Sequence, residues 1–347
     1  MRYAALADLL SDRVNPIVIQ QVRRGLRSRT FSVAFVLLLV ACVVASLVGY
    51  VAYDPDSPGK TGQGLFGAYF FCFSLVGFVV IPFGAFRSLS NDRDDRTWPL
   101  VILTELTPRQ ILSGTIGSYL VQAALYASVT MPFLLFSYLF QGIPLTGVGL
   151  VIGYSVPYLV FLVVVCTCAA TLTQSRLARG ALTIALLGGL VMQVFFVLSA
   201  VTTTLLFPKV GALDDLLVGT LIFAILLLSY GTLAFSVGAS RLTFEADNHA
   251  QAPRLALLFH FTVLTGVSLF IHTHSPDGSQ VHDLWIMAQL YLAALFVSTE
   301  PDGLSKRLLE SPPRLQLGGM LLPGALRGLA FSVVVTLAIT AVRLWMH

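Results

Sequence analysis

Few residues of this chain have the types and spacing of a catalytic site. Gly59-Lys60-Thr61 is the nearest approach to a phosphate-binding loop. Such a loop needs another glycine five residues before Gly59, and that position is occupied by Asp54. The sequence also has neither the H-E-x-x-H pattern of zinc proteases nor the G-x-S-x-G turn of serine hydrolases. It therefore predicts no catalytic residue and no directly bound cofactor, and the chain is not expected to be an enzyme.

Histidine and cysteine side chains form only weak candidate metal sites. Histidines and aspartates gather in the segment 272–283, which is expected to be a solvated outer loop where polar residues are ordinary. Cys166 and Cys168 stand two residues apart, and helical residues at that spacing do not face each other. The sequence therefore predicts no metal ligand.

Ionisable side chains are scarce in the apolar parts of the chain. No Asp, Glu, Lys or Arg is expected at the centre of an apolar block. Proton- and ion-coupled carriers usually need such buried groups. We interpret His260, which is expected near the end of one block, as a hydrogen-bonded packing residue rather than a proton relay. A carrier driven through buried carboxylates is therefore disfavoured.

The composition indicates that long apolar helices must position any functional residue. Of the 347 residues, 56% are hydrophobic and 11% are charged, and the mean hydropathy is +0.84. Soluble domains have roughly a quarter charged residues, so a soluble enzyme is excluded. Several apolar blocks exceed the roughly 18 residues that mark a membrane-spanning helix. The predicted fold class is all-α, a polytopic membrane helix bundle of about nine spans: Phe31–Tyr53, Leu65–Phe86, Ile116–Phe140, Val148–Thr173, Ala181–Leu206, Leu216–Gly238, Ala256–Ile271, Leu284–Val297 and Leu322–Trp345.

The distribution of basic residues predicts the orientation. With a cytoplasmic N-terminus, eighteen of the 21 Lys and Arg residues lie on the cytoplasmic side, which is the usual positive-inside bias. We expect an integral protein of the plasma (inner) membrane whose first block is a retained helix rather than a signal peptide. The formal charge of +4 is too small to indicate nucleic acid as a partner.

The segment 14–29 is predicted to form a helix along the membrane surface. Asn15 suits the N-cap, and Pro16 suits the first helical position. The following residues fall on two opposite faces, one apolar and one polar: Val18, Ile19, Val22 and Leu26 against Gln20, Arg23, Arg24 and Arg27. Such a helix suits the interface of a bilayer with anionic lipids.

The predicted cytoplasmic loop 87–115 is long for a connection between neighbouring spans. It begins with the charged run 91–96 and continues with the amphiphilic stretch 97–106. Thr107-Pro108-Arg109-Gln110 then predicts a capping box with proline at the first helical position. A short apolar helix before Thr107 needs a surface to bury against, which is lipid, the bundle itself or a soluble partner.

Three stretches of the sequence resemble the membrane permease subunit of type-2 ATP-binding-cassette (ABC) exporters. Residues 15–29 before the first span resemble the connecting helix of those permeases. Asp94-Asp95-Arg96-Thr97 with the leucine-rich 98–104 resembles their charged run and short helix. The segment 107–114 resembles their lead into the third span, although Thr115 stands where the family often has lysine. The resemblance covers roughly residues 14–245.

The resemblance implies an organisation in three parts: a cytoplasmic segment 1–30, a six-helix permease core 31–245 and additional C-terminal helices 246–347. It also implies a separate ABC ATPase subunit, which binds ATP and Mg, and a second permease copy or a related permease. The loop 87–115 would couple the ATPase to the core. The residues implied in this contact are Thr97, Leu100, Leu103, Glu105, Leu106, Thr107, Pro108 and Arg109.

Two alternatives remain beside this interpretation. An ATP-independent secondary transporter predicts a functional His260, and a non-transporting scaffold predicts a stable complex without nucleotide-linked transport. The mostly apolar spans favour a lipid-like or amphiphilic cargo if the chain is a transporter. Two glycine pairs are predicted to permit close helix packing: Gly149 with Gly153, and Gly324 with Gly328.

Overall fold

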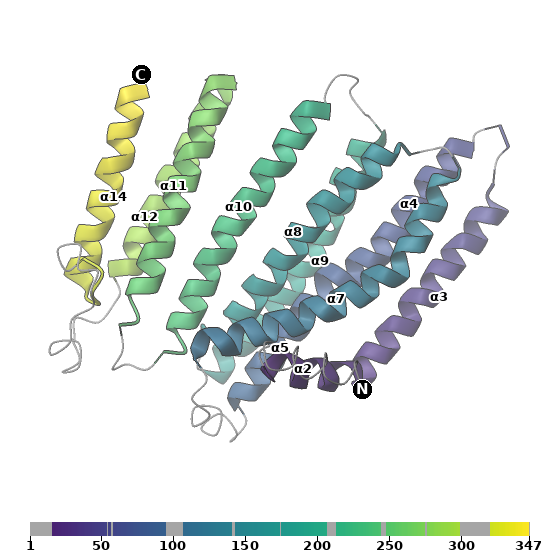
Figure 1. Cartoon of the computed structure of the whole chain (residues 1–347), viewed down its shortest axis with the longest axis horizontal. Coiled ribbons are helices and arrows are strands. Elements are labelled where there is room, and N and C mark those ends of the chain that lie inside the picture. Colours follow the sequence, from purple (N-terminus) through teal and green to yellow (C-terminus); the bar gives the residue numbers. More distant parts are fainter. Residues whose placement is uncertain are drawn as a thin grey trace, which may run out of the picture. The chain divides into compact units, whose positions relative to one another are not determined.

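The computed structural model describes residues 16–53, 55–56, 58–94, 107–140, 143–173, 175–206, 213–243, 248–274, 276–298 and 320–346. Every element in this part of the chain is a helix (Figure 1). In order, they are α2 (Pro16–Leu26), α3 (Arg29–Val51), α4 (Pro58–Leu75), η1 (Val76–Val80), α5 (Ile81–Asp94), α7 (Pro108–Tyr138), α8 (Leu145–Ala169), α9 (Arg176–Leu206), α10 (Leu213–Ser240), α11 (Gln251–His274), α12 (Pro276–Ser298) and α14 (Ala325–Met346).

Helices long and apolar enough to cross a bilayer dominate the structure. Among the described residues there are eight: Arg29–Val51, Gly59–Asp92, Pro108–Tyr138, Leu145–Ala169, Arg176–Thr203, Leu217–Ser240, Gln251–Thr273 and Ala325–Val342. They leave large apolar side chains uncovered; Leu37 and Leu47 of α3, for example, are 62% and 60% exposed. A helix satisfies its own backbone hydrogen bonds, so such surfaces suit lipid. The predicted fold class, a polytopic all-α membrane helix bundle, is confirmed.

The predicted eighth span differs from the others in the length of its apolar stretch. The predicted eighth span falls on α12, whose described apolar stretch, Leu284–Leu295, is shorter than the other eight. The predicted count of nine therefore stays a prediction.

The second span extends further than the sequence predicted. The helices α4, η1 and α5 follow one another without a break, so the predicted end at Phe86 lies inside a helix. The helix α7 begins at Pro108, and the helices therefore enter the predicted loop 87–115 from both sides. The change from apolar to polar residues after Phe86 marks the edge of the apolar zone, but polar residues also support helix, so the helix continues to Asp94.

The chain divides into two compact units, Met1–Ala224 and Ile225–His347. In the first unit, close helix contacts and buried aromatic rings join α3 and α4. The hydroxyl groups of Ser46 and Tyr69 share a hydrogen bond of 2.7 Å. A Cβ atom at Gly49 would lie 2.4 Å from Cδ2 of Leu65, so the glycine permits this approach. The aromatic side chains with at most 2% exposure are Phe66, Tyr69, Phe70, Phe78, Phe86 and Tyr126.

The second unit has its own apolar core between α11, α12 and α14. It consists of Leu257, Phe261, Leu264, Ile286, Leu290, Leu321, Phe331, Val335 and Ile339. Asn248 adds a polar link, because its side-chain amide donates to the carbonyl of Leu321 at 3.2 Å. The turn before α14 is thereby attached to the beginning of α11.

The side chain of Arg254 is the most unusual feature of the second unit. Arg254 is one of the basic residues counted on the predicted cytoplasmic side, between two apolar blocks, but it lies in α11 with 0% exposure. Its guanidinium donates to the carbonyls of Met320, of Leu322 at 2.6 Å and of Gly324 at 3.3 Å. Because the carbonyl dipoles converge on the charge, a cation is accommodated here without exposure to solvent.

Gly324 lies in the turn before the last described helix. It precedes α14 rather than lying within it, and its φ of 136° is in the region that favours glycine. Its carbonyl accepts the first helical hydrogen bond, from the backbone N–H of Gly328 at 2.9 Å. The glycine is therefore favoured by the turn, and the helix packing predicted for Gly324 and Gly328 stays a prediction.

Candidate functional site

The start of α7 is fixed by local hydrogen bonds at one end of the first unit. The hydroxyl of Thr107 accepts from the backbone N–H of Gln110 at 3.3 Å, and the side chain of Gln110 accepts from the backbone N–H of Thr107 at 2.9 Å. Pro108 occupies the first helical position, and Arg109 is exposed. The predicted capping box is present, so α7 begins at a defined point directly after the segment 95–106.

Most residues of the predicted coupling contact lie outside the described part of the chain. Thr97, Leu100, Leu103, Glu105 and Leu106 all fall in 95–106, and only three of the predicted residues are described. Those three, Thr107, Pro108 and Arg109, are the beginning of α7 and lie together at its first turn.

The short helix α2 packs against α7 at the same end of the first unit (Figure 1). Asn15 lies outside the described residues, and α2 begins at Pro16. Its two arginines, Arg23 and Arg24, are exposed, as is Arg27 directly after the helix. On its other side Val18 reaches α7, where its Cγ2 atom lies 3.4 Å from the Cβ position of Gly117. Val22 is half-buried, whereas Leu26 is 37% exposed.

A polar contact that the sequence did not predict holds α2 to α7. The side-chain amide of Gln21 donates to the hydroxyl of Thr115 at 3.2 Å, and the hydroxyl of Ser118 donates to the amide oxygen of Gln21 at 3.1 Å. Thr115 and Ser118 are both 0% exposed. The sequence feature that could have indicated this contact is Gln21 itself, an uncharged polar residue between Val18 and Val22 on the apolar side of the helix. Thr115, which departs from the resembled family, fits this contact by size and by its hydroxyl.

The close contact between α2 and α7 is possible because Gly25 has no side chain. A Cβ atom at Gly25 would lie 2.5 Å from Nε2 of Gln122, which is buried in α7. On the side of α5, Arg24 and Asp92 form an ion pair with an N–O distance of 3.6 Å. The arginine side chain is 79% exposed, so this pair contributes little beyond orientation. α2 is thus attached to both helices that flank the segment 95–106.

A π-helical turn interrupts the second span in the interior of the first unit. The turn η1 displaces the regular hydrogen-bond pattern, and the side-chain amide of Gln193 in α9 donates to the carbonyl of Phe78 at 3.2 Å. The hydroxyl of Tyr158 in α8 donates to the amide oxygen of Gln193. Such turns occur often at functional sites. Here the turn connects three spans through one half-buried glutamine.

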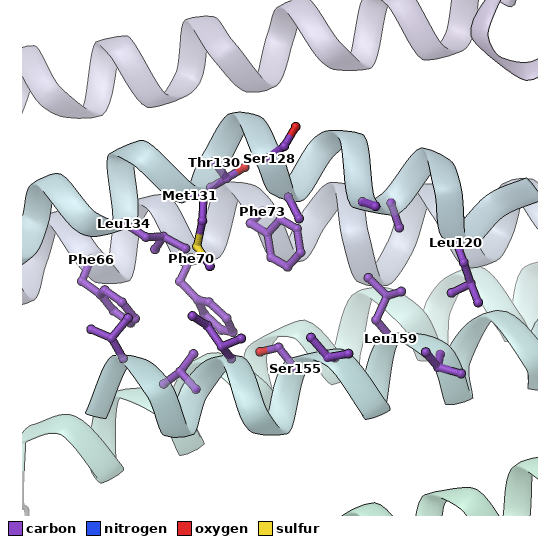
Figure 2. Close-up of a pocket in the computed structure, with 18 residues that line it drawn as sticks. Phe66, Phe70, Phe73, Leu120, Ser128, Thr130, Met131, Leu134, Ser155 and Leu159 are labelled. Carbon is purple, nitrogen blue, oxygen red and sulfur yellow. The ribbon is translucent and has the colours of Figure 1, made fainter. Parts of the chain in front are cut away.

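An apolar cavity of about 500 Å³ lies between α4, α7 and α8. Figure 2 shows Phe70 and Met131 directed into the space between the helices, opposite Ser155 and Leu159. Two hydroxyl groups that line the cavity have backbone partners: that of Ser128 donates to the carbonyl of Leu125 at 2.7 Å, and that of Thr130 to the carbonyl of Tyr126 at 3.0 Å. The cavity therefore offers volume and apolar contact to a ligand, with almost no specific hydrogen bonding.

A second apolar cavity of similar size, about 500 Å³, lies on the other side of α8. Val151 and Ser155 of α8 line both cavities. Its wall is aromatic, since the rings of Tyr154 and Phe223 lie 5.3 Å apart and those of Phe78 and Tyr158 lie 5.4 Å apart. The two cavities therefore lie against one helix, α8.

The glycine pair in α8 does not pack tightly within the described chain. A Cβ atom at Gly149 would meet no atom within 4 Å, and one at Gly153 would meet Cγ2 of Thr220 at 3.6 Å. The close contacts of the first unit occur instead at Gly25 and Gly49.

His260 lies in a polar network within the second unit. It is 1% exposed, and its ring nitrogens pair with the hydroxyl of Ser229 at 3.1 Å and the amide oxygen of Gln289 at 3.2 Å. The amide nitrogen of Gln289 donates to the hydroxyl of Tyr230, whose ring centroid lies 4.4 Å from that of His260. This agrees with the interpretation of His260 as a hydrogen-bonded packing residue.

Comparisons with known proteins add no assignment to this geometry. No protein-family model matches the chain, and neither a curated protein nor a solved structure matches it.

Proposed function

We propose that this chain is the membrane-spanning permease subunit of an ABC transporter. In this proposal a separate ATPase subunit binds ATP and Mg, and a second permease copy or a related permease completes the transporter. The N-terminus is cytoplasmic, so that α2, the end of α5 and the start of α7 face the ATPase. The resemblance of three sequence stretches to type-2 ABC permeases is the origin of the proposal.

The observation that carries the proposal is the junction at Thr107. A force applied to the segment 95–106 is transmitted to the spans only if the helix that follows does not unwind. The closed capping box stabilises that helix end by about 1 kcal/mol and resists fraying. The junction is therefore suited to receive a motion and to pass it to a span of 31 residues.

The contact of α2 with α7 supports the same mechanism. Thr115 lies two turns after the capping box, and it is joined to Gln21 of α2. When the first turns of α7 tilt, the hydrogen bonds of Gln21 require α2 to follow. Since α7 also lines the apolar cavity, the tilt changes the space between α7 and α8. An ATP-driven change in the loop would in this way alter the cavity in which an apolar or amphiphilic cargo resides.

The test is recovery of an ATPase with the full-length protein. The tagged chain is purified from its native membrane in a mild detergent, and the proteins bound to it are identified. We expect an ABC ATPase with the wild type, and its loss with Leu103→Asp and with Glu105→Arg. Arg176→Glu is the matched control, because it reverses an exposed charge at the start of α9, outside the loop.

Two results would contradict the proposal. One is the absence of any ATPase when other membrane complexes survive the same detergent. The other is retention of the ATPase by both loop variants with nucleotide-dependent transport unchanged.

A further inference from the structure

A polar cavity of about 610 Å³ lies where α2 meets the ends of the spans. Its walls come from α2, the beginning of α3, the turn η1, the helices α5 and α7, and one residue of α9, Leu187. It is separate from the two apolar cavities and lies at the end of the first unit where α5 ends and α7 begins. None of the functional steps proposed above uses it.

The charged residues that line this cavity have a positive balance. Arg24 and Arg87 both line it, and Asp92 is the one carboxylate among its lining residues. Asp92 pairs with Arg24 at 3.6 Å, whereas Arg87 is exposed and forms no ion pair with an acid in the described part of the chain. Guanidinium groups bind phosphate oxygens through two parallel hydrogen bonds. Two arginines with a single carboxylate therefore favour an anionic ligand with several oxygens.

Other residues add hydrogen-bond donors to the cavity wall. Ser28 caps α3, and the next residues along the cavity wall, Thr30 and Phe31, belong to the first turn of that helix. The positive end of the α3 dipole adds to the attraction of an anion by the arginines. Asn91 of α5 and Gln122 of α7 supply further side-chain amides to the wall.

Apolar residues from the membrane-spanning part of the chain also line the cavity. Val80, Phe83 and Leu187 line it, and Val80 is 37% exposed. These residues come from η1, α5 and α9, whose helices are long and apolar enough to cross a bilayer. A free phosphate ion would leave this surface uncovered, whereas the glycerol and first acyl carbons of a phospholipid would cover it.

We propose that this cavity binds the phosphate headgroup of a membrane phospholipid, with Arg87 as the main contact and Arg24 shared between the phosphate and Asp92. The acyl chains extend along Val80 and Leu187 into the bilayer. The bound lipid then joins α2, α5 and α7, so that the position of α2 depends on the lipid as well as on Gln21. This inference requires no ATPase and stands apart from the proposed function.

The test measures lipid binding to the detergent-purified, delipidated full-length protein by native mass spectrometry. Phosphatidylglycerol is the probe, diacylglycerol with the same chains lacks the phosphate, and inorganic phosphate lacks the chains. We expect phosphatidylglycerol to bind, and Arg87→Gln to weaken its binding about tenfold. Arg87→Lys keeps the charge but not the paired donors, so we expect an intermediate loss. Neither diacylglycerol nor inorganic phosphate should bind in a manner that depends on Arg87.

Two further variants separate a built site from general charge attraction. Arg23→Gln removes an exposed arginine one residue from Arg24 that does not line the cavity, so it should weaken binding much less than Arg87→Gln. Asp92→Asn releases Arg24 and should strengthen binding severalfold, a gain that misfolding cannot produce.

The proposal is overturned by any of three results. Equal losses for Arg23→Gln and Arg87→Gln would show attraction to surface charge alone. Displacement of the lipid by inorganic phosphate, with the same dependence on Arg87, would assign the site to free phosphate. Weaker binding by Asp92→Asn would exclude competition between the carboxylate and the headgroup.

Discussion

The two units of the chain use buried polar residues in opposite ways. In the first unit, Gln21 joins α2 to α7 beside an open polar cavity, with neutral hydrogen bonds of 3.1 and 3.2 Å. In the second unit, Arg254 and His260 are almost completely enclosed, and each bonds to two or more groups. Separating the first contact leaves groups that water can reach, whereas separating the second leaves them in an apolar core. The first contact is therefore suited to move and the second to remain fixed.

Among the variants that test this comparison, a substitution of Arg254 should cause the largest loss of stability. Arg254→Met keeps the apolar stem but removes the donors to the carbonyls of Met320 and Leu322. We expect a loss of about 3 kcal/mol, seen as a decrease in Tm of roughly 10 °C in detergent. Arg327→Met is the matched control, since Arg327 is half-buried and donates to one carbonyl of the same turn, that of Pro323, at 3.2 Å. It should cost less than about 1 kcal/mol. Equal and small effects of both variants would remove the distinction between the two units.

Disruption of the hydrogen-bond network around His260 should have the next largest effect. It should lower the stability of the protein rather than change proton coupling. His260→Phe removes the ring nitrogens that pair with Ser229 and Gln289, so the amide oxygen of Gln289 loses this partner, which costs about 1–3 kcal/mol. His272→Phe, at a half-exposed position of the same helix, should cost little. Thermal unfolding measures both variants. A variant at His260 that keeps full stability but loses pH-dependent transport would instead favour the secondary-transporter alternative.

Local sequence was sufficient for some features of the candidate site. The capping box was predictable because Thr107 and Gln110 are three residues apart and act within one turn. The spans were predictable because a bilayer requires long apolar helices. Charged residues follow Phe86, so the sequence predicted that the second span ends there. The helix continues to Asp94, because composition reports the environment of a helix better than its end.

Other features depend on tertiary packing that the sequence alone does not specify. Gln21 and Thr115 are 94 residues apart, and nothing in either segment indicates the other. The side chain of Arg254 was indistinguishable from a loop cation until α11 and the turn at Gly324 were placed together. The cavity beside α2 needs five helices and one π-helical turn to form, so no single stretch of sequence predicts it.

The smallest expected effect is the coupling between Gln21 and Thr115, which decides whether α2 and α7 move together. A double-mutant cycle with Gln21→Leu and Thr115→Val should give a coupling energy of about 1 kcal/mol. Hydrogen exchange of the α2 amides measures it, because opening of α2 exposes these amides without unfolding the spans. Gln20→Leu is the control, since Gln20 is exposed on the same helix. A coupling energy near zero would mean that α2 is held by Val18 and the close approach at Gly25 alone. In that case α7 would tilt without moving α2. The motion proposed to start at Thr107 would then reach only one helix of the first unit.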